Sequence, residues 1–154
     1  MRALLLATLM ATASSLALAN PDPALLVGQW QCDFAERNDD MSMEMTSQIN
    51  YNADRSASFD MTLDMDIPAM GQAIKLGMNG AGSWTLDGDQ LVVTTTTYDI
   101  ENLGEDGPFV DMMMGQFEAT DMIGSESRTT IVELTSSRLV ELPEEGGPTT
   151  TCTR

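Results

Sequence analysis

Apolar and polar residues alternate with a period of two along much of the 154-residue chain, and this pattern constrains the fold more than any other feature. The alternation is clearest in residues 41–51 and 55–67. The apolar faces contain Met41, Met43, Met45, Ser47, Ile49 and Tyr51 in the first segment, and Ala57, Phe59, Met61, Leu63, Met65 and Ile67 in the second. Because successive side chains of a strand point to opposite faces of a sheet, both segments are predicted to be strands with one buried face. The turn-forming residues 52–54 would join them into a hairpin.

Shorter segments continue the pattern toward the C-terminus. Further strands are predicted over residues 82–86, 91–98, 128–135, 138–142 and 149–153. The first two flank Asp87-Gly88-Asp89, which is a strong hairpin-turn sequence. Short strands separated by turns are typical of an all-β barrel or sandwich.

One stretch does not alternate. Residues 104–108 have the glycine, proline and acidic residues of a loop, and residues 109–122 carry apolar side chains spaced as on one helical face. Pro108 suits the first turn of a helix. We therefore expect a short helix or a covering loop near residues 108–120.

The N-terminus has the parts of a secretory signal peptide. Residues 1–19 contain a basic Arg2, an apolar run and the cleavage sequence Ala17-Leu18-Ala19. The run is too short and too rich in serine and threonine for a transmembrane helix, which needs about 20 apolar residues. We therefore expect a periplasmic or secreted protein without a membrane span, in which residues 20–154 form a single β-barrel domain.

The chain is strongly acidic, with 24 acidic and 7 basic residues. Loss of residues 1–19, which contain one arginine and no acid, takes the net charge from −17 to −18. Proteins that bind DNA or RNA need a basic surface for the phosphates, so no nucleic-acid partner is expected. Solubility is the simplest role for such a charge.

Two cysteines, Cys32 and Cys152, lie near opposite ends of residues 20–154. In an oxidising export compartment such a pair is expected to form a disulfide rather than two free thiols. If they face each other on antiparallel strands, Trp30 and Arg154 also face each other, since each lies two residues away. An arginine over an indole ring is a favourable cation–π contact. The first and last strands would then be neighbours, which closes the sheet into a barrel.

Gly28-Gln29-Trp30, at the start of the first predicted strand, resembles the Gly-x-Trp motif of the lipocalins. In that family the tryptophan packs at the closed end of an up-and-down barrel and a basic residue lies across it, as Arg154 would here. Thr97-Tyr98-Asp99 is only loosely similar to the family's Thr-Asp-Tyr motif. The chain also stops at Arg154, without the C-terminal helix of other lipocalins. The resemblance thus implies a small bacterial lipocalin-like (calycin-type) barrel, all-β and antiparallel, with about eight strands.

Methionine is unusually frequent, with 13 in the chain, and several lie on the predicted inward faces. The resemblance implies an interior that binds a small apolar ligand. The candidate lining residues are Met41, Met43, Met45, Phe59, Met61, Leu63, Met65 and Trp84. The same side chains could instead fill the barrel, because methionine is an adaptable core residue and a barrel of this size can be filled by side chains. Thioethers also bind Cu(I), so Met41, Met43 and Met45 form a further, less favoured alternative.

No set of residues suggests catalysis. The chain has no histidine, which removes Ser-His-Asp and Cys-His mechanisms and the usual zinc ligand. Most carboxylates fall on the polar faces of predicted strands, where water solvates them. We therefore predict a protein that is not an enzyme and that has no cofactor and no metal. The alternative to ligand binding is an envelope protein-interaction module or inhibitor that acts through the loops 35–40 and 101–125.

Overall fold

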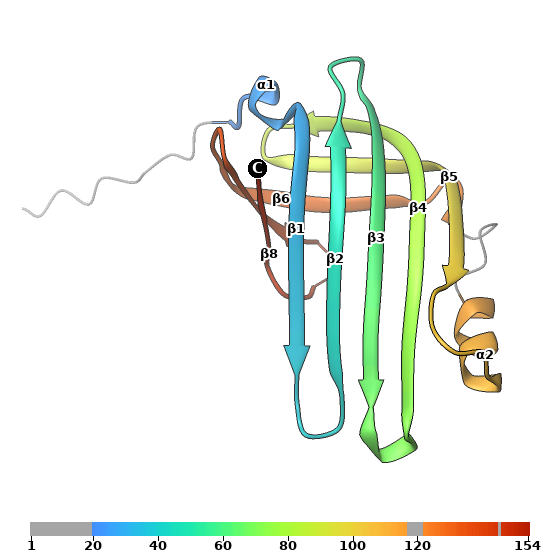
Figure 1. The fold of residues 1–154 in the computed structure, drawn as a ribbon. Helices are drawn as coiled ribbons and strands as arrows, with labels where there is room; N and C mark the ends of the chain where they lie inside the picture. Colours follow the sequence, from blue (N-terminus) through green and yellow to red (C-terminus); the bar gives the residue numbers. More distant parts are fainter. Residues whose placement is uncertain (1–19, 117–121, 145) are drawn as a thin grey trace, which may run out of the picture.

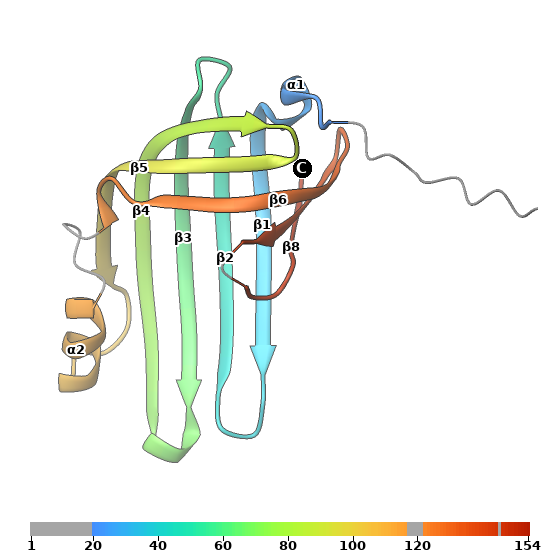
Figure 2. The same ribbon diagram turned by 180° about the vertical axis from the view of Figure 1, so that it is seen from behind.

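The structure, a computed structural model, describes residues 20–116, 122–144 and 146–154 (Figures 1 and 2). Eight antiparallel strands form a closed barrel in which each strand pairs with the next and the last pairs with the first. The strands are β1 (Gly28–Arg37), β2 (Ser42–Tyr51), β3 (Ser56–Ile67), β4 (Gln72–Asp87), β5 (Gln90–Asn102), β6 (Glu126–Leu134), β7 (Arg138–Pro143) and β8 (Thr150–Thr153). The predicted all-β up-and-down barrel is confirmed.

Short helical elements accompany the strands. They are α1 (Pro23–Leu26), the 3-10 helix η1 (Pro68–Met70) and α2 (Pro108–Gln116). Helix α2 confirms a short helix in the non-alternating stretch and begins at Pro108, as expected. The rest of that stretch as far as residue 121, and the predicted signal peptide in residues 1–19, lie outside the described residues.

The strands are unequal in length, so the barrel closes only at one end. In the part of the chain that the structure describes, β8 pairs with β1 from Gln31 to Asp33, and β6 pairs with β5 from Gln90 to Thr94. Beyond these pairs, β1 to β5 continue as an open sheet toward α2 (Figures 1 and 2). We call the end with α1 and the β2–β3 and β4–β5 turns the closed end, and the end with α2 the far end.

Strands β4 and β5 bend sharply between the closed end and the far end of the barrel (Figure 1). The register shifts between Ala81 and Gly82, which marks a β-bulge. A Cβ atom on Gly82 would overlap the carbonyl of Thr94, and one on Gly80 would overlap the ring of Phe59. Glycine is therefore required where these two strands cross closely and turn.

Strand β4 departs most from the sequence-based expectation. It begins at Gln72, well before the predicted start at residue 82, and β5 runs past residue 98 to Asn102. The missed segment does alternate, with Ile74, Leu76 and Met78 buried. Four glycines within and beside it, Gly71, Gly77, Gly80 and Gly82, weaken the strand pattern in the sequence.

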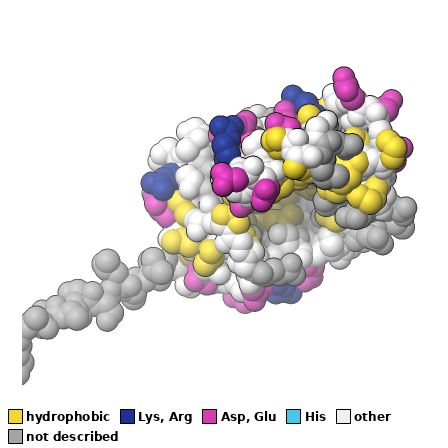
Figure 3. Space-filling model, turned by 90° about the horizontal axis from the view of Figure 1, so that it is seen from below, with side chains coloured by type: hydrophobic (Ala, Val, Ile, Leu, Met, Phe, Trp, Pro, Cys, Tyr) yellow, Lys and Arg dark blue, Asp and Glu magenta, His cyan; other side chains and the backbone are white. Residues whose placement is uncertain are grey.

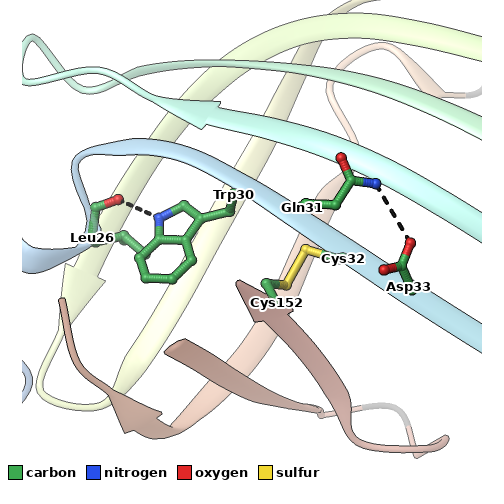
Figure 4. Close-up of a disulfide and its surroundings, with 6 residues drawn as sticks. All are labelled: Leu26, Trp30, Gln31, Cys32, Asp33 and Cys152. Atoms are coloured by element: carbon green, nitrogen blue, oxygen red, sulfur yellow. Dashed lines mark hydrogen bonds between the residues drawn. A yellow bond between two sulfur atoms is a disulfide. The ribbon is translucent and has the colours of Figure 1, made fainter. Parts of the chain in front are cut away.

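The closed end is sealed around Trp30. The disulfide Cys32–Cys152 joins β1 to β8 at paired positions, which confirms the predicted bridge (Figure 4). The Trp30 indole N–H donates to the Leu26 carbonyl over 2.8 Å, and the Arg154 guanidinium carbon lies 4.2 Å from the centre of the Trp30 rings. The stacked Arg154 is the arrangement that the strand register predicts.

Arg154 also binds the backbone on both sides of the closed end. Its guanidinium N–H groups donate to the carbonyls of Leu25 and Val27 over 2.8 Å and to that of Ser136 over 2.7 Å. Gly28 makes this possible, because its φ is +128° and a Cβ atom there would lie 2.7 Å from the Arg154 guanidinium. The glycine of the Gly-x-Trp motif is thus needed both for its backbone angle and for the space that it leaves.

Candidate ligand site

The barrel contains a cavity of about 300 Å³ that is partly open to solvent and is lined by residues of two core clusters. The first cluster, at the closed end, contains Leu26, Trp30, Cys32, Tyr51, Ala57, Trp84, Leu91, Ile131, Leu139 and Cys152. The second, toward the far end, contains Leu63, Ile74, Leu76, Met78 and Val110. The cavity is lined by Ile49, Tyr51, Ala57, Phe59, Met61, Met78, Leu91, Val93, Thr95, Tyr98, Met122, Ser127, Thr129 and Glu141. Most of this lining is apolar or aromatic, as in sites for small apolar molecules.

Among the described lining residues, Glu141 is the only Asp, Glu, Lys or Arg. It lies on β7 opposite Ile131 of β6, and only 7 % of it is exposed. Burial raises the pKa of its carboxyl group to about 7, because the charged form loses its hydration. Its Oε1 atom has no hydrogen-bond partner among the described residues. A buried carboxyl group with an unpartnered oxygen is a strong hydrogen-bond acceptor in apolar surroundings.

Tyr51 and Thr129 lie in the same lining as Glu141. Burial and the charge of Glu141 together raise the pKa of the Tyr51 hydroxyl well above its usual value, so Tyr51 stays neutral. Thr129 lies two residues before Ile131, the cross-strand neighbour of Glu141, and therefore faces the same side of the sheet. Its Oγ1 atom is also buried without a partner among the described residues. The β6–β7 wall of the cavity thus contains two buried side-chain oxygens without a partner among the described residues.

Aromatic packing supports the wall at the closed end. Tyr51 meets Trp84 edge to face, with ring centres 5.9 Å apart. The Trp84 indole N–H donates to the Asn52 carbonyl over 3.1 Å, and the Arg55 guanidinium carbon lies 4.2 Å from the centre of the Trp84 rings. Trp84 is thus held by Asn52 and Arg55, and it packs against the ring of Tyr51.

The structure places the predicted lining residues in different surroundings. Phe59 and Met61 line the cavity. Trp84 lies in the first core cluster, behind Tyr51. The remaining residues with inward positions, Leu63, Met43, Met45 and Met65, belong to the second core cluster or pack against it.

Met41 lies just before β2 and is half-buried, outside the cavity lining. Met43 and Met45 lie across from Met65 and Leu63 on β3, in an apolar setting. Core packing accounts for these side chains without a metal. Copper binding by the three methionines remains a prediction without a structural observation in its favour.

Helix α2 covers part of the open sheet at the far end. Its Val110 is buried in the second core cluster, and Phe109, Met113 and Met114 pack against the same cluster. Seen from this end, hydrophobic side chains gather at the surface around a recessed area (Figure 3). The predicted loop 101–125 is therefore partly strand and partly helix, and the predicted loop 35–40 is shortened because β1 extends to Arg37.

A second hollow, of about 340 Å³, lies against the outer faces of β1 to β4. Gln29, Gln48, Asp60 and Asn79 line it and are exposed. Water solvates such groups well, so this hollow offers little driving force for an apolar molecule.

Glu141 was missed in the sequence because carboxylates were assigned to solvated faces. Glu141 lies two residues after Leu139 on β7, so the two side chains point to the same face of the sheet. Because Leu139 is fully buried, this spacing indicates that Glu141 also points inward. Tyr98 was missed for a different reason. The bulge in the β4–β5 pairing near Gly82 changes which residues of β5 face inward, and this irregularity is not evident from the sequence.

Among the described residues, no group of three or more His, Cys, Asp or Glu side chains is placed to hold a metal ion. No helix in the described part of the chain has the length and apolar character to span a bilayer. The chain matches no protein-family model and no curated protein sequence.

Proposed function

We propose that this protein is an exported, lipocalin-like barrel that binds a small apolar ligand in its interior cavity. The observation that carries the proposal is the cavity of about 300 Å³ with its mainly apolar lining. A side-chain-filled barrel, the alternative interpretation, would leave no such space. The volume lies at the lower end of the range found for small-molecule sites.

Membership of the lipocalin group is part of this proposal. It is supported by the eight-stranded up-and-down order, by Gly28-Gln29-Trp30 at the start of β1, and by Arg154 over the indole of Trp30. Export is supported by the signal-like residues 1–19 and by the Cys32–Cys152 disulfide, since disulfides persist mainly in oxidising compartments. We therefore propose a periplasmic or extracellular location.

Native mass spectrometry of the protein purified from the cells that produce it tests the proposal. The expected spectrum contains an added mass that disappears on denaturation. Val93→Phe, which enlarges a lining residue, is expected to abolish this added mass. The matched control Val92→Phe changes the preceding residue of β5, which points to the opposite face, and should retain the added mass. Wild-type protein without any bound molecule, and with equal behaviour of the two variants, would contradict the proposal.

A second candidate function, protein interaction in the cell envelope, is favoured by one observation. Leu103, Met112 and Ile123 are large, exposed hydrophobic residues, and all three lie in the segment 101–125. Exposed apolar side chains grouped in one segment are typical of contact surfaces. A pull-down from envelope extract should recover a partner with wild-type protein and lose it with Leu103→Ser/Met112→Ser. Val132→Ser, an exposed change on β6, is the control.

A further inference from the structure

The cavity has a polar side that a purely apolar ligand would leave unused. Among the described residues, two buried side-chain oxygens lack a hydrogen-bond partner, Oε1 of Glu141 and Oγ1 of Thr129. Both residues line the cavity, and Ser127 lies beside them on β6. A buried acceptor without a donor costs free energy, and the cost is larger when the acceptor is charged. A ligand that supplies hydrogen-bond donors at this wall would recover that cost.

The sign of the charge selects among ligand head groups. The lining residues that the structure describes include a carboxyl group and no Lys, Arg or His, and the whole chain carries a net charge of −17. A carboxylate or phosphate head would be repelled by Glu141 and by the field of the protein. A cationic head would be attracted by both.

We propose that the ligand is a cationic amphiphile, an alkyl or aryl amine whose protonated nitrogen binds Glu141 and Thr129 while its apolar part contacts Phe59, Met61 and Met78. This inference rests on the proposed function, since it names the ligand class of the same cavity. An ammonium group has three donors and no acceptor, so it can donate to more than one acceptor oxygen. Charge-assisted bonds of this kind are the stronger ones in proteins.

The cavity volume limits the apolar part. An apolar cavity of about 150 Å³ admits benzene, so about 300 Å³ has room for a molecule of about ten non-hydrogen atoms. n-Octylamine fits this limit, and 1-octanol and octanoate have the same chain with a neutral and an anionic head. Comparing these three compounds therefore separates the contribution of the alkyl chain to the binding affinity from that of the head group.

Binding is expected to be coupled to a proton. The other titratable groups in the lining, Tyr51 and Tyr98, keep their protons near neutral pH because burial raises the pKa of each. The residues that flank Glu141 on β6 and β8, Ile131 and Thr150, do not titrate. Alkylammonium ions have a pKa of about 10, so the amine is charged throughout. Octylamine should therefore displace close to one proton from Glu141 at pH 6 and none at pH 8.5.

Calorimetric titrations of the protein with the three octyl compounds test the inference. They are run at pH 6 and pH 8.5 in buffers of different ionisation enthalpy, with 0.5 M NaCl to screen ion pairing at the acidic surface. At pH 8.5 octylamine should bind about ten- to a hundredfold more tightly than 1-octanol, with one site per chain. Octanoate should bind more weakly than 1-octanol. At pH 6 the affinity for octylamine should fall about tenfold.

Two variants complete the test. Glu141→Gln should lose the preference for octylamine and the proton release, while its retained binding of 1-octanol shows that it is folded with an open cavity. Glu144→Gln, an exposed change of the same charge just after β7, should behave as wild type. If octylamine and 1-octanol bind equally, or Glu141→Gln keeps the preference, the inference fails and the proposed function stands. If none of the three compounds binds, the proposed function fails as well.

Discussion

At the scale of single residues, Glu141 has the largest predicted effect on stability. Its pKa of about 7 in the folded protein compares with an ordinary value of 4.5, so the folded state holds the proton more tightly than the unfolded chain. Between these two pH values the unfolded chain ionises first, and the free energy of unfolding falls as pH rises. Above pH 7 the full cost of the buried charge, about 3 kcal/mol, is present.

Glu141→Gln removes this cost. The variant should be more stable than wild type by up to about 3 kcal/mol at pH 8 and nearly equal to it at pH 4.5. Urea denaturation across pH 4.5–8 measures the difference between the two proteins, which cancels the contribution of the other acidic groups. Glu144→Gln provides the control, because its carboxyl group is exposed. A difference that does not change with pH would show that Glu141 is not buried as described.

Arg154 is the second residue with a specific prediction. Its guanidinium donates to three backbone carbonyls and covers the ring of Trp30. Arg154→Lys keeps the charge but not the planar set of donors, so a loss of about 1–3 kcal/mol is expected from urea denaturation. Arg138→Lys, in an exposed ion pair with Glu133, should change stability by less than about 1 kcal/mol. Equal effects at the two positions would argue against a special role for Arg154.

At the scale of elements, the weakest join in the barrel is the one between β1 and β8. β8 has four residues and pairs with β1 at three positions, of which the disulfide is the middle one. Cys32→Ala/Cys152→Ala should lower the free energy of unfolding by about 2–5 kcal/mol, because the bridge restrains a loop of 120 residues in the unfolded chain. Denaturation of oxidised wild type and the double variant measures this. An equally stable variant would mean that packing alone closes the barrel.

The elements also show how far the sequence predicts the fold. Strands β2 and β3 follow from uninterrupted alternation, and the pairing of β1 with β8 follows from Cys32 and Cys152. The first half of β4 was missed because its glycines, required by the close crossing with β5, carry no apolar signal. The predicted lining residues lie only partly at the cavity. Phe59 and Met61 line it, while Glu141 and Tyr98 depend on strand parity and on a bulge that only the assembled sheet reveals.

At the scale of the whole molecule, the two ends of the barrel differ in construction. The closed end is held by a disulfide, by two tryptophans stacked under arginines and by the first core cluster. The far end is an open sheet over which α2 packs. The cavity lies between them, so a ligand is held by a fixed wall at one side, and the far end offers the less restricted way in.

Methionine-methyl NMR during a titration with 1-octanol tests the central claim, that the interior cavity holds a small apolar molecule. Met61 and Met78 line the cavity, whereas Met112 is exposed on α2. The account predicts that the Met61 and Met78 methyl signals shift together with one common dissociation constant, and that the Met112 signal does not move. Shifts confined to Met112, or no shift of any methyl up to the solubility limit of 1-octanol, would contradict it.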